Sequence, residues 1–290
     1  MLLLENAGMP ELPEVETIAR SLRPALIGRR IESAEIRWAR TIAAPSIRRF
    51  KQQVKGQVIR DVGRRAKFLH IRLSASHLLI HLRMSGDLQV REGKARPEKH
   101  DRLIIVLSHS PLQASSPGWD KGGSELTRLV FSDARKFGRV WLTDRVETVT
   151  SHLGPEPLSA AFTPQLLYDR LHARRRRLKP LLLDQTFLAG LGNIYTDEAL
   201  HLAKLHPLRS SETISRRQAQ NLHGAIRSVL KQGIRRNGAS IDWVYRGGEF
   251  QNHFRVYDRR GEPCPACGTA IKRLVVGQRG THVCPRCQRM

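Results

Sequence analysis

Cysteine, acidic residues and long apolar runs are all scarce in this chain of 290 residues. All four cysteines lie within the last thirty positions, so the rest of the chain has no disulfide framework of the kind that small secreted domains use. No apolar run is long enough to span a bilayer, and the N-terminus does not resemble a secretory signal. These absences argue against a membrane protein and against a disulfide-stapled secreted domain.

The shortage of acidic residues leaves a large positive charge. The chain has 26 Asp and Glu against 50 Lys and Arg, which gives a formal net charge of +24. The basic residues are spread through the sequence, so the excess is not a disordered basic tail, and it indicates a polyanionic partner. The length suggests about two domains. We therefore expect a cytoplasmic, nucleic-acid-binding protein.

The cysteines form two C-x2-C pairs, separated by a longer loop: Cys264 with Cys267, and Cys284 with Cys287. This spacing is typical of a structural zinc site with four thiolate ligands, which leaves no open coordination position for catalysis. Two disulfides are the alternative, and a cytoplasmic protein disfavours them. We expect one structural Zn²⁺.

The stretch Met9-Pro10-Glu11 suggests covalent chemistry. Methionine before proline favours removal of the methionine, which would leave Pro10 as a terminal secondary amine that is partly uncharged near neutral pH. Such an amine can attack the anomeric carbon of a sugar and form an iminium, with Glu11 as proton donor or relay. The alternative is an ordinary helix start, since Pro13 and Glu14 suit a first helical turn. Both interpretations can hold together.

Residues 1–8 conflict with this chemistry, because Pro10 is not a free amine while they precede it. The octapeptide has no basic region and is too short for a signal peptide. The codons of Glu5 and Asn6 must be purine-rich, as a bacterial ribosome-binding site would be. We expect residues 1–9 to be a mis-assigned leader plus the true initiator, Met9.

Behind the first helix, which we expect Pro24 to end, the pattern changes to short alternating or β-branched segments between turns. Many such segments in succession predict a sandwich of antiparallel sheets. A Ser-, Gly- and Pro-rich stretch, Ser108–Glu125, predicts a long loop. The expected strands are Ile31–Ile42, Ala66–Leu73, His77–Met84, Leu88–Arg91, Arg102–Leu107, Leu126–Ser132 and Arg139–Leu142.

From about Thr150 the pattern is helical. Thr163 before Pro164 predicts an N-cap, and Ser215 with Gln218 predicts a capping box. Further helices are expected over Lys179–Leu188 and Asn193–Leu205, with Asn193 as the cap of the second.

A series of motifs runs through the chain from Met9: PELPEVET at 10–17, RRAKF at 64–68, HLRMSG at 81–86, KHD at 99–101, DARKFG at 133–138, HLGPEPL at 152–158, GLGNIY at 190–195 and GEPCPACG…CPRCQ at the end. With these motifs in this order, nearly the whole chain closely resembles the formamidopyrimidine-DNA glycosylases, bacterial enzymes that excise oxidised purines. The resemblance implies an α+β multidomain fold with three parts. These are a catalytic β-sandwich over 10–145, a helix–two-turn–helix domain over 146–250 and a zinc finger with a β-hairpin over 254–289.

The resemblance implies catalytic roles for four residues. Pro10 matches the nucleophile and Glu11 the catalytic acid. Lys67 matches a lysine that acts with them at the lesion, and Arg279 matches a finger arginine that contacts phosphate during δ-elimination. On spacing alone, Lys67 would equally be a strand lysine and Arg279 a surface arginine.

The resemblance also implies a set of DNA contacts. Three residues, Met84, Arg135 and Phe137, match those that fill the gap left by a flipped nucleotide, although by sequence alone Met84 and Phe137 would be core residues. Backbone contacts are implied for His100, Lys136, Arg175, Lys179 and Asn193. Lys136 and Arg175 exchange one cation for another relative to the common family residue, which a phosphate contact tolerates. Arg83 replaces a residue that is often small.

These expectations combine into a bifunctional DNA glycosylase and abasic-site lyase. It would act as a monomer on duplex DNA containing oxidised bases or abasic sites, in the bacterial cytoplasm at the nucleoid, without a redox or nucleotide cofactor. One alternative is a glycosylase of the endonuclease VIII type that prefers oxidised pyrimidines. Leu12 and the intact set of Met84, Arg135 and Phe137 favour the oxidised-purine branch. The other is a non-catalytic damaged-DNA-binding protein, which would follow if Pro10 is not N-terminal.

Overall fold

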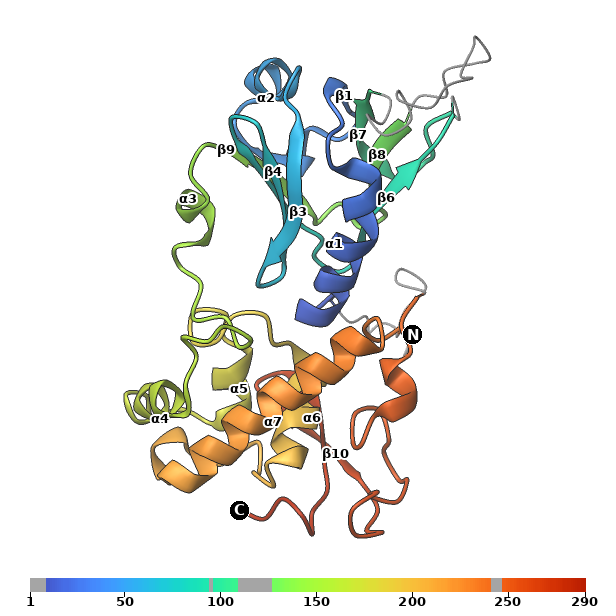
Figure 1. Cartoon of the computed structure of the whole chain (residues 1–290). Helices are drawn as coiled ribbons and strands as arrows, with labels where there is room; N and C mark the ends of the chain where they lie inside the picture. The colour runs from blue at the N-terminus through green and yellow to red at the C-terminus, as the bar shows by residue number, and fades with distance from the viewer. Residues whose placement is uncertain (1–8, 94–95, 109–126, 241–246) are drawn as a thin grey trace. The chain divides into compact units, whose positions relative to one another are not determined.

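The computed structural model describes residues 9–93, 96–108, 127–240 and 247–290 (Figure 1). Packing divides the chain into two compact units. The first, the sandwich unit, is Val15–Ser151, and the second, the helical unit, joins the residues up to Glu14 to His152–Met290. The expected leader over residues 1–8, and all of the expected long loop except Ser108, lie outside the described residues.

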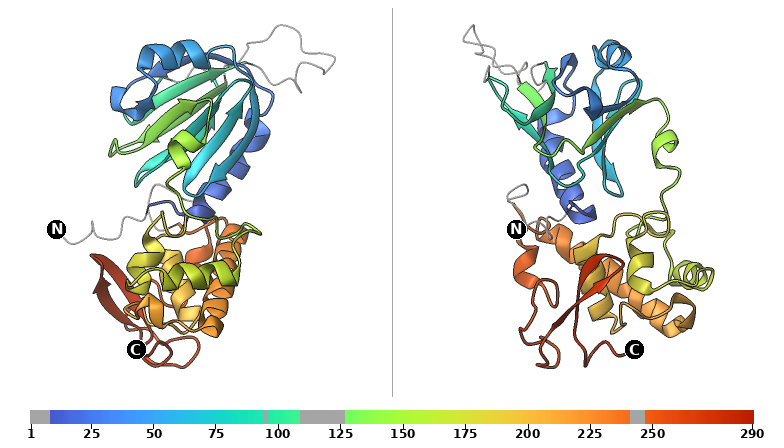
Figure 2. Two further views of the ribbon diagram at one scale, coloured as in Figure 1. Left: turned by 90° about the vertical axis from the view of Figure 1, so that its left-hand side faces the viewer. Right: turned by 180° about the vertical axis from the view of Figure 1, so that it is seen from behind.

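The sandwich unit contains two β-sheets that form separate layers (Figures 1 and 2). One sheet has the order β1-β7-β8-β6, and every pair of neighbours in it is antiparallel. The other has the order β2-β9-β5-β4-β3, in which only β2 and β9 are parallel. The strands are β1 (Ile31–Ile36), β2 (Ile42–Ala44), β3 (Ile59–Arg65), β4 (Phe68–Leu73), β5 (His77–His81), β6 (Gly86–Arg91), β7 (Asp101–Leu107), β8 (Thr127–Asp133) and β9 (Arg139–Thr143).

The predicted sandwich is confirmed, but two strand predictions are wrong. The chain does not form one strand over Ile31–Ile42. It leaves the first sheet after Ile36, turns through the 3-10 helix η1 (Ala39–Thr41), and enters the second sheet as β2. The sequence also gave no sign of β3, because only its first half carries buried apolar residues. Pairing with β4 holds this strand in place, which a local pattern does not reveal.

Helix α1 (Leu12–Leu26) continues past Pro24, contrary to the prediction that this proline ends it. Proline has no backbone N–H and so removes one hydrogen bond to the preceding turn of the helix. Near a helix end, few further hydrogen bonds depend on that turn, and the helix can continue. The Ile27 N–H still donates to the Arg23 carbonyl oxygen at 3.2 Å. A second helix that the sequence pattern did not predict, α2 (Ile47–Val54), buries Phe50 and Val54. The short α3 (Glu147–Thr150) ends this unit.

The helical unit is built around α6, whose residues are mostly buried. The predicted Thr163 cap and the Ser215–Gln218 capping box are both confirmed by their hydrogen bonds. Helix α5 ends five residues earlier than predicted, because the chain turns at Asp184. The elements are α4 (Pro164–His172), α5 (Leu178–Leu183), α6 (Asn193–Leu202), η2 (Ser211–Thr213), α7 (Arg216–Arg235), η3 (Phe250–His253), β10 (Lys272–Val276) and β11 (Arg279–Val283).

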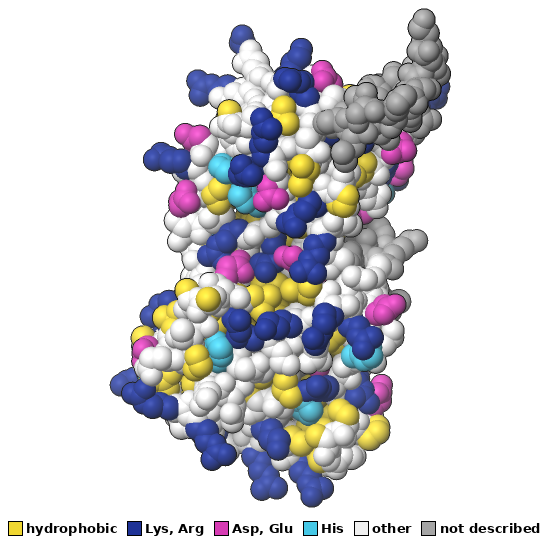
Figure 3. Space-filling model, in the orientation of Figure 1, with side chains coloured by type: hydrophobic (Ala, Val, Ile, Leu, Met, Phe, Trp, Pro, Cys, Tyr) yellow, Lys and Arg dark blue, Asp and Glu magenta, His cyan; other side chains and the backbone are white. Residues whose placement is uncertain are grey.

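Strands β10 and β11 form a two-stranded hairpin beside the four cysteines. Lys and Arg side chains are scattered over the visible face of both units, with fewer Asp and Glu (Figure 3). No helix in the described ranges is both long and apolar enough to cross a membrane.

Candidate active site and nucleic-acid interface

The start of α6 is held by a carboxylate from the far end of the chain. Glu11 accepts a hydrogen bond from the Gly192 N–H at 2.5 Å and another from the Ile194 N–H at 2.9 Å. The N–H groups at the start of a helix have no partner within the helix, and the helix N-terminus favours a negative charge. The prediction that Asn193 caps this helix is therefore wrong, since Gly192 occupies the cap position and the carboxylate comes from Glu11.

A second buried carboxylate, Glu14, holds the same segment. It accepts hydrogen bonds from the Glu11 N–H at 2.9 Å, the Tyr195 hydroxyl at 2.7 Å and the Ala239 N–H at 2.8 Å. Burial raises the pKa of Glu14 above its usual value, although these hydrogen bonds oppose the shift. The backbone around the buried Pro10 is thereby fixed to α6.

Tyr257 belongs to this cluster, and the sequence pattern gave no signal for it. Burial raises the pKa of its phenol, and the nearby charge of Glu11 raises it further. The Asn193 Oδ1 atom is buried without a hydrogen-bond partner among the described residues. Asn193 therefore places a buried, unsatisfied oxygen at the N-terminus of α6.

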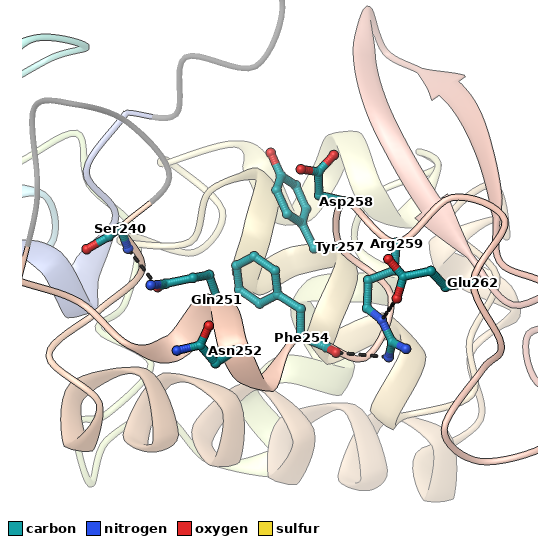
Figure 4. A pocket seen from close by; sticks show the side chains of 8 residues that line it. All are labelled: Ser240, Gln251, Asn252, Phe254, Tyr257, Asp258, Arg259 and Glu262. Atoms are coloured by element: carbon teal, nitrogen blue, oxygen red, sulfur yellow. Dashed lines mark hydrogen bonds and ion pairs between the residues drawn. The ribbon is translucent and has the colours of Figure 1, made fainter.

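A cavity of about 630 Å³ lies beside Tyr257 (Figure 4). Ser240 and Gln251 lie on one side of the Phe254 ring, and Tyr257 lies on the other. The Ser240 N–H donates to Gln251 Oε1 at 2.9 Å, which ties the chain before the undescribed residues 241–246 to η3. The cavity combines an aromatic ring with hydrogen-bonding groups. The lining is completed by Asn252, Asp258, Arg259 and Glu262.

Lys179 is buried, whereas a contact with DNA phosphate requires an exposed cation. Its side chain is 0% exposed, and Nζ contacts Asp197 Oδ1 at 2.6 Å and the Gly280 carbonyl oxygen at 2.9 Å. Desolvation lowers the pKa of Lys179, and Asp197 opposes this. The ammonium is thus used inside the protein, where it joins α5 and α6 to the hairpin that carries Arg279.

Two adjacent acidic residues of α6 bind the C-terminal region. Asp197 Oδ2 accepts the His282 N–H of β11 at 2.8 Å. Glu198 accepts backbone N–H groups from Arg255 at 3.0 Å, and from Val256 and Tyr257 at 2.9 Å. Because these bonds are buried, they fix the hairpin and the Tyr257 segment to the helix that Glu11 caps.

Arg279 lies at the start of β11, next to a two-residue turn. Gly277 and Gln278, which form the turn, have positive φ values of 56° and 61°. A Cβ at Gly277 would lie 3.1 Å from Pro180 Cγ, so the turn packs closely on α5. The Arg279 side chain is exposed, as a phosphate contact requires.

The four cysteine sulfurs are arranged as a metal site. Their Sγ atoms lie within 4.8 Å of one another, with Cys267 and Cys284 at 3.4 Å and Cys264 and Cys287 at 4.0 Å. Tetrahedral zinc with bonds of about 2.3 Å separates its sulfurs by about 3.8 Å. Burial and the neighbouring sulfurs raise the pKa of Cys287, and a bound dication would oppose this by stabilising the thiolates. The donor set fits Zn²⁺.

The sandwich unit carries Lys67 in the turn between β3 and β4. Arg65 pairs with Phe68, so Ala66 and Lys67 are the two turn residues, and Ala66 has a φ of 53°. That backbone region favours glycine, so the turn is strained at the residue before Lys67. The Lys67 side chain is only 8% exposed.

One buried carboxylate connects the loops that carry Met84, Arg135 and Phe137, the residues expected to fill the gap. Asp133 accepts hydrogen bonds from the Ser85 hydroxyl, from the Arg135 N–H at 3.1 Å and from the Gly138 N–H at 2.7 Å. Met84 precedes Ser85 and is half-buried, and Phe137 is 49% exposed. Neither Met84 nor Phe137 is a core residue, which is the alternative that the sequence alone favoured.

The remaining predicted contacts of this unit are exposed. His100 Nδ1 lies 3.3 Å from Arg102 Nη2, and the Lys136 ammonium lies 4.2 Å from the centre of the Trp38 ring. Arg83 has a φ of 57°, and its N–H donates to the His81 Nδ1 atom at 3.1 Å. The departure at Arg83 is therefore accommodated by a hydrogen bond to a buried histidine. Arg175, in the helical unit, is exposed.

Three family models match the chain in order. They describe a formamidopyrimidine-DNA glycosylase N-terminal domain over residues 9–140, the H2TH domain of the same enzymes over 153–244, and a zinc finger found in FPG and IleRS over 261–289. Two relatives named formamidopyrimidine-DNA glycosylase, from Chloroflexus aggregans and Chloroflexus aurantiacus, are 47% and 46% identical. Each alignment covers 97% of this chain and 98% of the relative.

Solved structures of such enzymes also match this chain over nearly its whole length. The Lactococcus lactis formamidopyrimidine-DNA glycosylase, bound noncovalently to DNA containing an AP site, is 34% identical with a TM-score of 0.85. MutM in complex with DNA containing carbocyclic 8-oxo-G is also 34% identical, with a TM-score of 0.84. Both alignments cover 97% of this chain and 100% of the other chain.

Proposed function

This chain belongs to the formamidopyrimidine-DNA glycosylase family, and we propose that it excises oxidised purines from duplex DNA and then cleaves the abasic site as a lyase. The observation that carries the proposal is the position of the Pro10-Glu11 segment. Glu11 and Glu14 fix it to the N-terminus of α6 within a chain that matches the family over its length.

The chemistry requires Pro10 to be the N-terminal residue, so we propose that translation starts at Met9 and that Met9 is removed. The Pro10 nitrogen would then attack the sugar C1′ atom. The N–C1′ bond forms as the glycosidic bond breaks, and the base leaves with a proton. Glu11, held by two backbone N–H groups, is suited to relay protons beside this centre. Lys67, from the sandwich unit, is proposed to act with it.

The nitrogen lone pair then opens the C1′–O4′ bond of the sugar and O4′ takes a proton. The iminium that results draws electrons from the sugar. Loss of a C2′ proton then releases the 3′-phosphate by β-elimination, and a further proton loss releases the 5′-phosphate by δ-elimination. We assign the phosphate contact of the second step to the exposed Arg279, which the Lys179–Asp197 pair and the Pro180 contact hold in place. The reaction needs no redox or nucleotide cofactor. When bound, zinc fixes the fold of the finger.

A reaction at a base in duplex DNA requires that the nucleotide be extruded from the base stack. We propose that Met84, Arg135 and Phe137 fill the gap, and that His100, Lys136 and Arg175 contact the DNA backbone. The exposure of Phe137 supports this role, because an apolar ring in solvent otherwise costs free energy. The cavity beside Tyr257 supports a place for an extruded nucleotide on the helical unit. For Asn193, at the N-terminus of α6, we propose a contact with a DNA phosphate through its side-chain NH2 group.

Borohydride trapping tests the proposal. Protein that begins at Pro10 is incubated with a duplex carrying one 8-oxoguanine, and reduction should give a covalent adduct at Pro10. The matched control is the same chain with residues 1–8 retained, which should bind the duplex and give no adduct. Tight binding without an adduct in the processed protein would leave a damaged-DNA binder. Faster excision of thymine glycol than of 8-oxoguanine would move the enzyme to the oxidised-pyrimidine class.

We propose that the protein acts as a monomer on chromosomal DNA in the bacterial cytoplasm. The relatives that match it over nearly their full length are bacterial, and its charge of +24 suits a DNA-bound enzyme. Size-exclusion chromatography with light scattering, with and without duplex, checks the monomer. A dimer mass for the free protein would contradict it.

A further inference from the structure

The C-terminal end of α6 reaches the zinc site through a histidine. His201 is 5% exposed, and its Nε2 atom lies 3.3 Å from the Sγ atom of Cys264. Its other ring nitrogen, Nδ1, is buried without a hydrogen-bond partner among the described residues. Cys264 itself is 2% exposed, so the contact is shielded from water.

The direction of this hydrogen bond follows from the metal site. A cysteine that binds zinc is a thiolate and has no proton to donate. The proton between the two residues must therefore be on Nε2, which makes His201 the donor and Cys264 Sγ the acceptor. Hydrogen bonds to metal ligands orient the ligands and change their electron density. Removing such a hydrogen bond commonly lowers the affinity for the metal.

The cysteines differ in their access to small molecules. A cavity of about 250 Å³ is lined by Cys287 together with His201, Pro265, Ala266 and Arg255. Cys264 does not line it, and the His201 ring contacts its sulfur. An electrophile that enters this cavity meets Cys287 first, while Cys264 is both covered and hydrogen-bonded.

We propose that His201 is a positioning residue of the zinc centre, which donates Nε2–H to the Cys264 thiolate and makes it less reactive than the cavity-lining Cys287. The donated hydrogen bond withdraws negative charge from the sulfur, so the sulfur is a poorer nucleophile and keeps its zinc bond. The finger is thereby anchored to the same helix whose other end binds Glu11.

The test compares zinc-loaded, full-length protein with two variants. His201→Phe keeps a ring of similar size and has no donor, whereas His201→Gln keeps an N–H donor. The apparent zinc affinity is measured by competition with a chromophoric chelator. We expect His201→Phe to lose about 10- to 100-fold in affinity and His201→Gln to recover part of it. His223→Phe is the matched control, because the His223 Nε2 atom contacts the Phe162 carbonyl oxygen at 2.7 Å and no sulfur.

A spectroscopic measurement separates hydrogen bonding from packing. In the Co²⁺-substituted protein the thiolate-to-metal charge-transfer band reports the charge on sulfur, so it should move to lower energy in His201→Phe and remain in place in His223→Phe. An unchanged band overturns the proposal even if the zinc affinity falls, since a packing defect then explains the loss. An unchanged affinity with an unchanged band overturns it as well.

Alkylation gives an independent outcome. Each reactive thiolate displaces iodide from iodoacetamide to form a thioether, and mass spectrometry of peptides gives the order of modification. We expect Cys287 to react before Cys264, and His201→Phe to speed modification of Cys264 several-fold. Equal rates at Cys264 in both proteins would contradict the proposal. None of these readouts depends on glycosylase activity, so the result stands apart from the proposed function.

Discussion

The Glu11 carboxylate and the Gly192 N–H form a hydrogen bond of 2.5 Å between residues 181 positions apart in the chain. Gly192 permits it, because the site has no room for a side chain. A Cβ there would lie 2.6 Å from the Glu11 Cγ and Oε1 atoms. The bond therefore depends on a glycine at one end and on a carboxylate beside the proposed nucleophile at the other.

Gly192→Ala should impair the chemistry with little change in DNA binding. The added methyl group must displace Glu11, and a shift of about 1 Å at a catalytic group commonly costs on the order of 100-fold in rate. Single-turnover excision and borohydride trapping measure this loss. Gly224→Ala is the control, because an added Cβ there meets no heavy atom within 4 Å. Equal rates for the two variants would show that the position of Glu11 is unimportant.

Lys179→Met should destabilise the protein without removing a phosphate contact. It leaves the buried Asp197 carboxylate without its cationic partner, which costs about 3–5 kcal/mol, and adding Asp197→Leu should recover part of this. Urea unfolding measures the stability. The salt dependence of DNA binding should keep its slope, whereas Arg175→Ala should reduce that slope by about 1. A reduced slope for the folded Lys179 variant would show that Lys179 does contact a DNA phosphate.

Asp133→Asn should weaken recognition of damaged DNA in particular. An amide in place of the carboxylate loses an acceptor for the Ser85 hydroxyl or the Gly138 N–H, which loosens the loops of Met84 and Phe137. We expect about a tenfold loss of affinity for an abasic-site duplex and little change for undamaged DNA, since each lost bond is worth about 1–3 kcal/mol. Asp144→Asn, at an exposed position, is the control. Equal losses on both duplexes would contradict this role.

His81 should make stability depend on pH. Burial, followed by the charges of Arg83 and Lys67, lowers the pKa of His81 to about 3 from the usual 6.5. The unfolded chain therefore binds the proton first as the pH falls. The stability is complete above pH 6.5 and decreases toward pH 3, by about 2 kcal/mol at pH 5. Urea unfolding of wild type and His81→Gln between pH 5 and 7.5 should show this difference. The same slope in both proteins would show that another group titrates.

Local sequence patterns predicted the features that local chemistry controls. The caps at Thr163 and Ser215 need only residues three positions apart, and both are present. The C-x2-C pairs place two sulfurs on each of two turns, and the four meet as expected. Patterns failed where pairing decides the structure, as at β3, where an adjacent strand holds a sequence that is poor in apolar residues.

The sequence by itself determined the family, the fold class and the zinc ligands, because these follow from motifs and spacings. Only the tertiary structure decided which group serves which end of α6. Glu11 rather than Asn193 caps its start, the Lys179 ammonium is buried against its middle, and His201 meets Cys264 at its end. Each of these contacts joins residues between 18 and 183 positions apart. Burial gives such contacts their strength, and burial is a property of the folded chain.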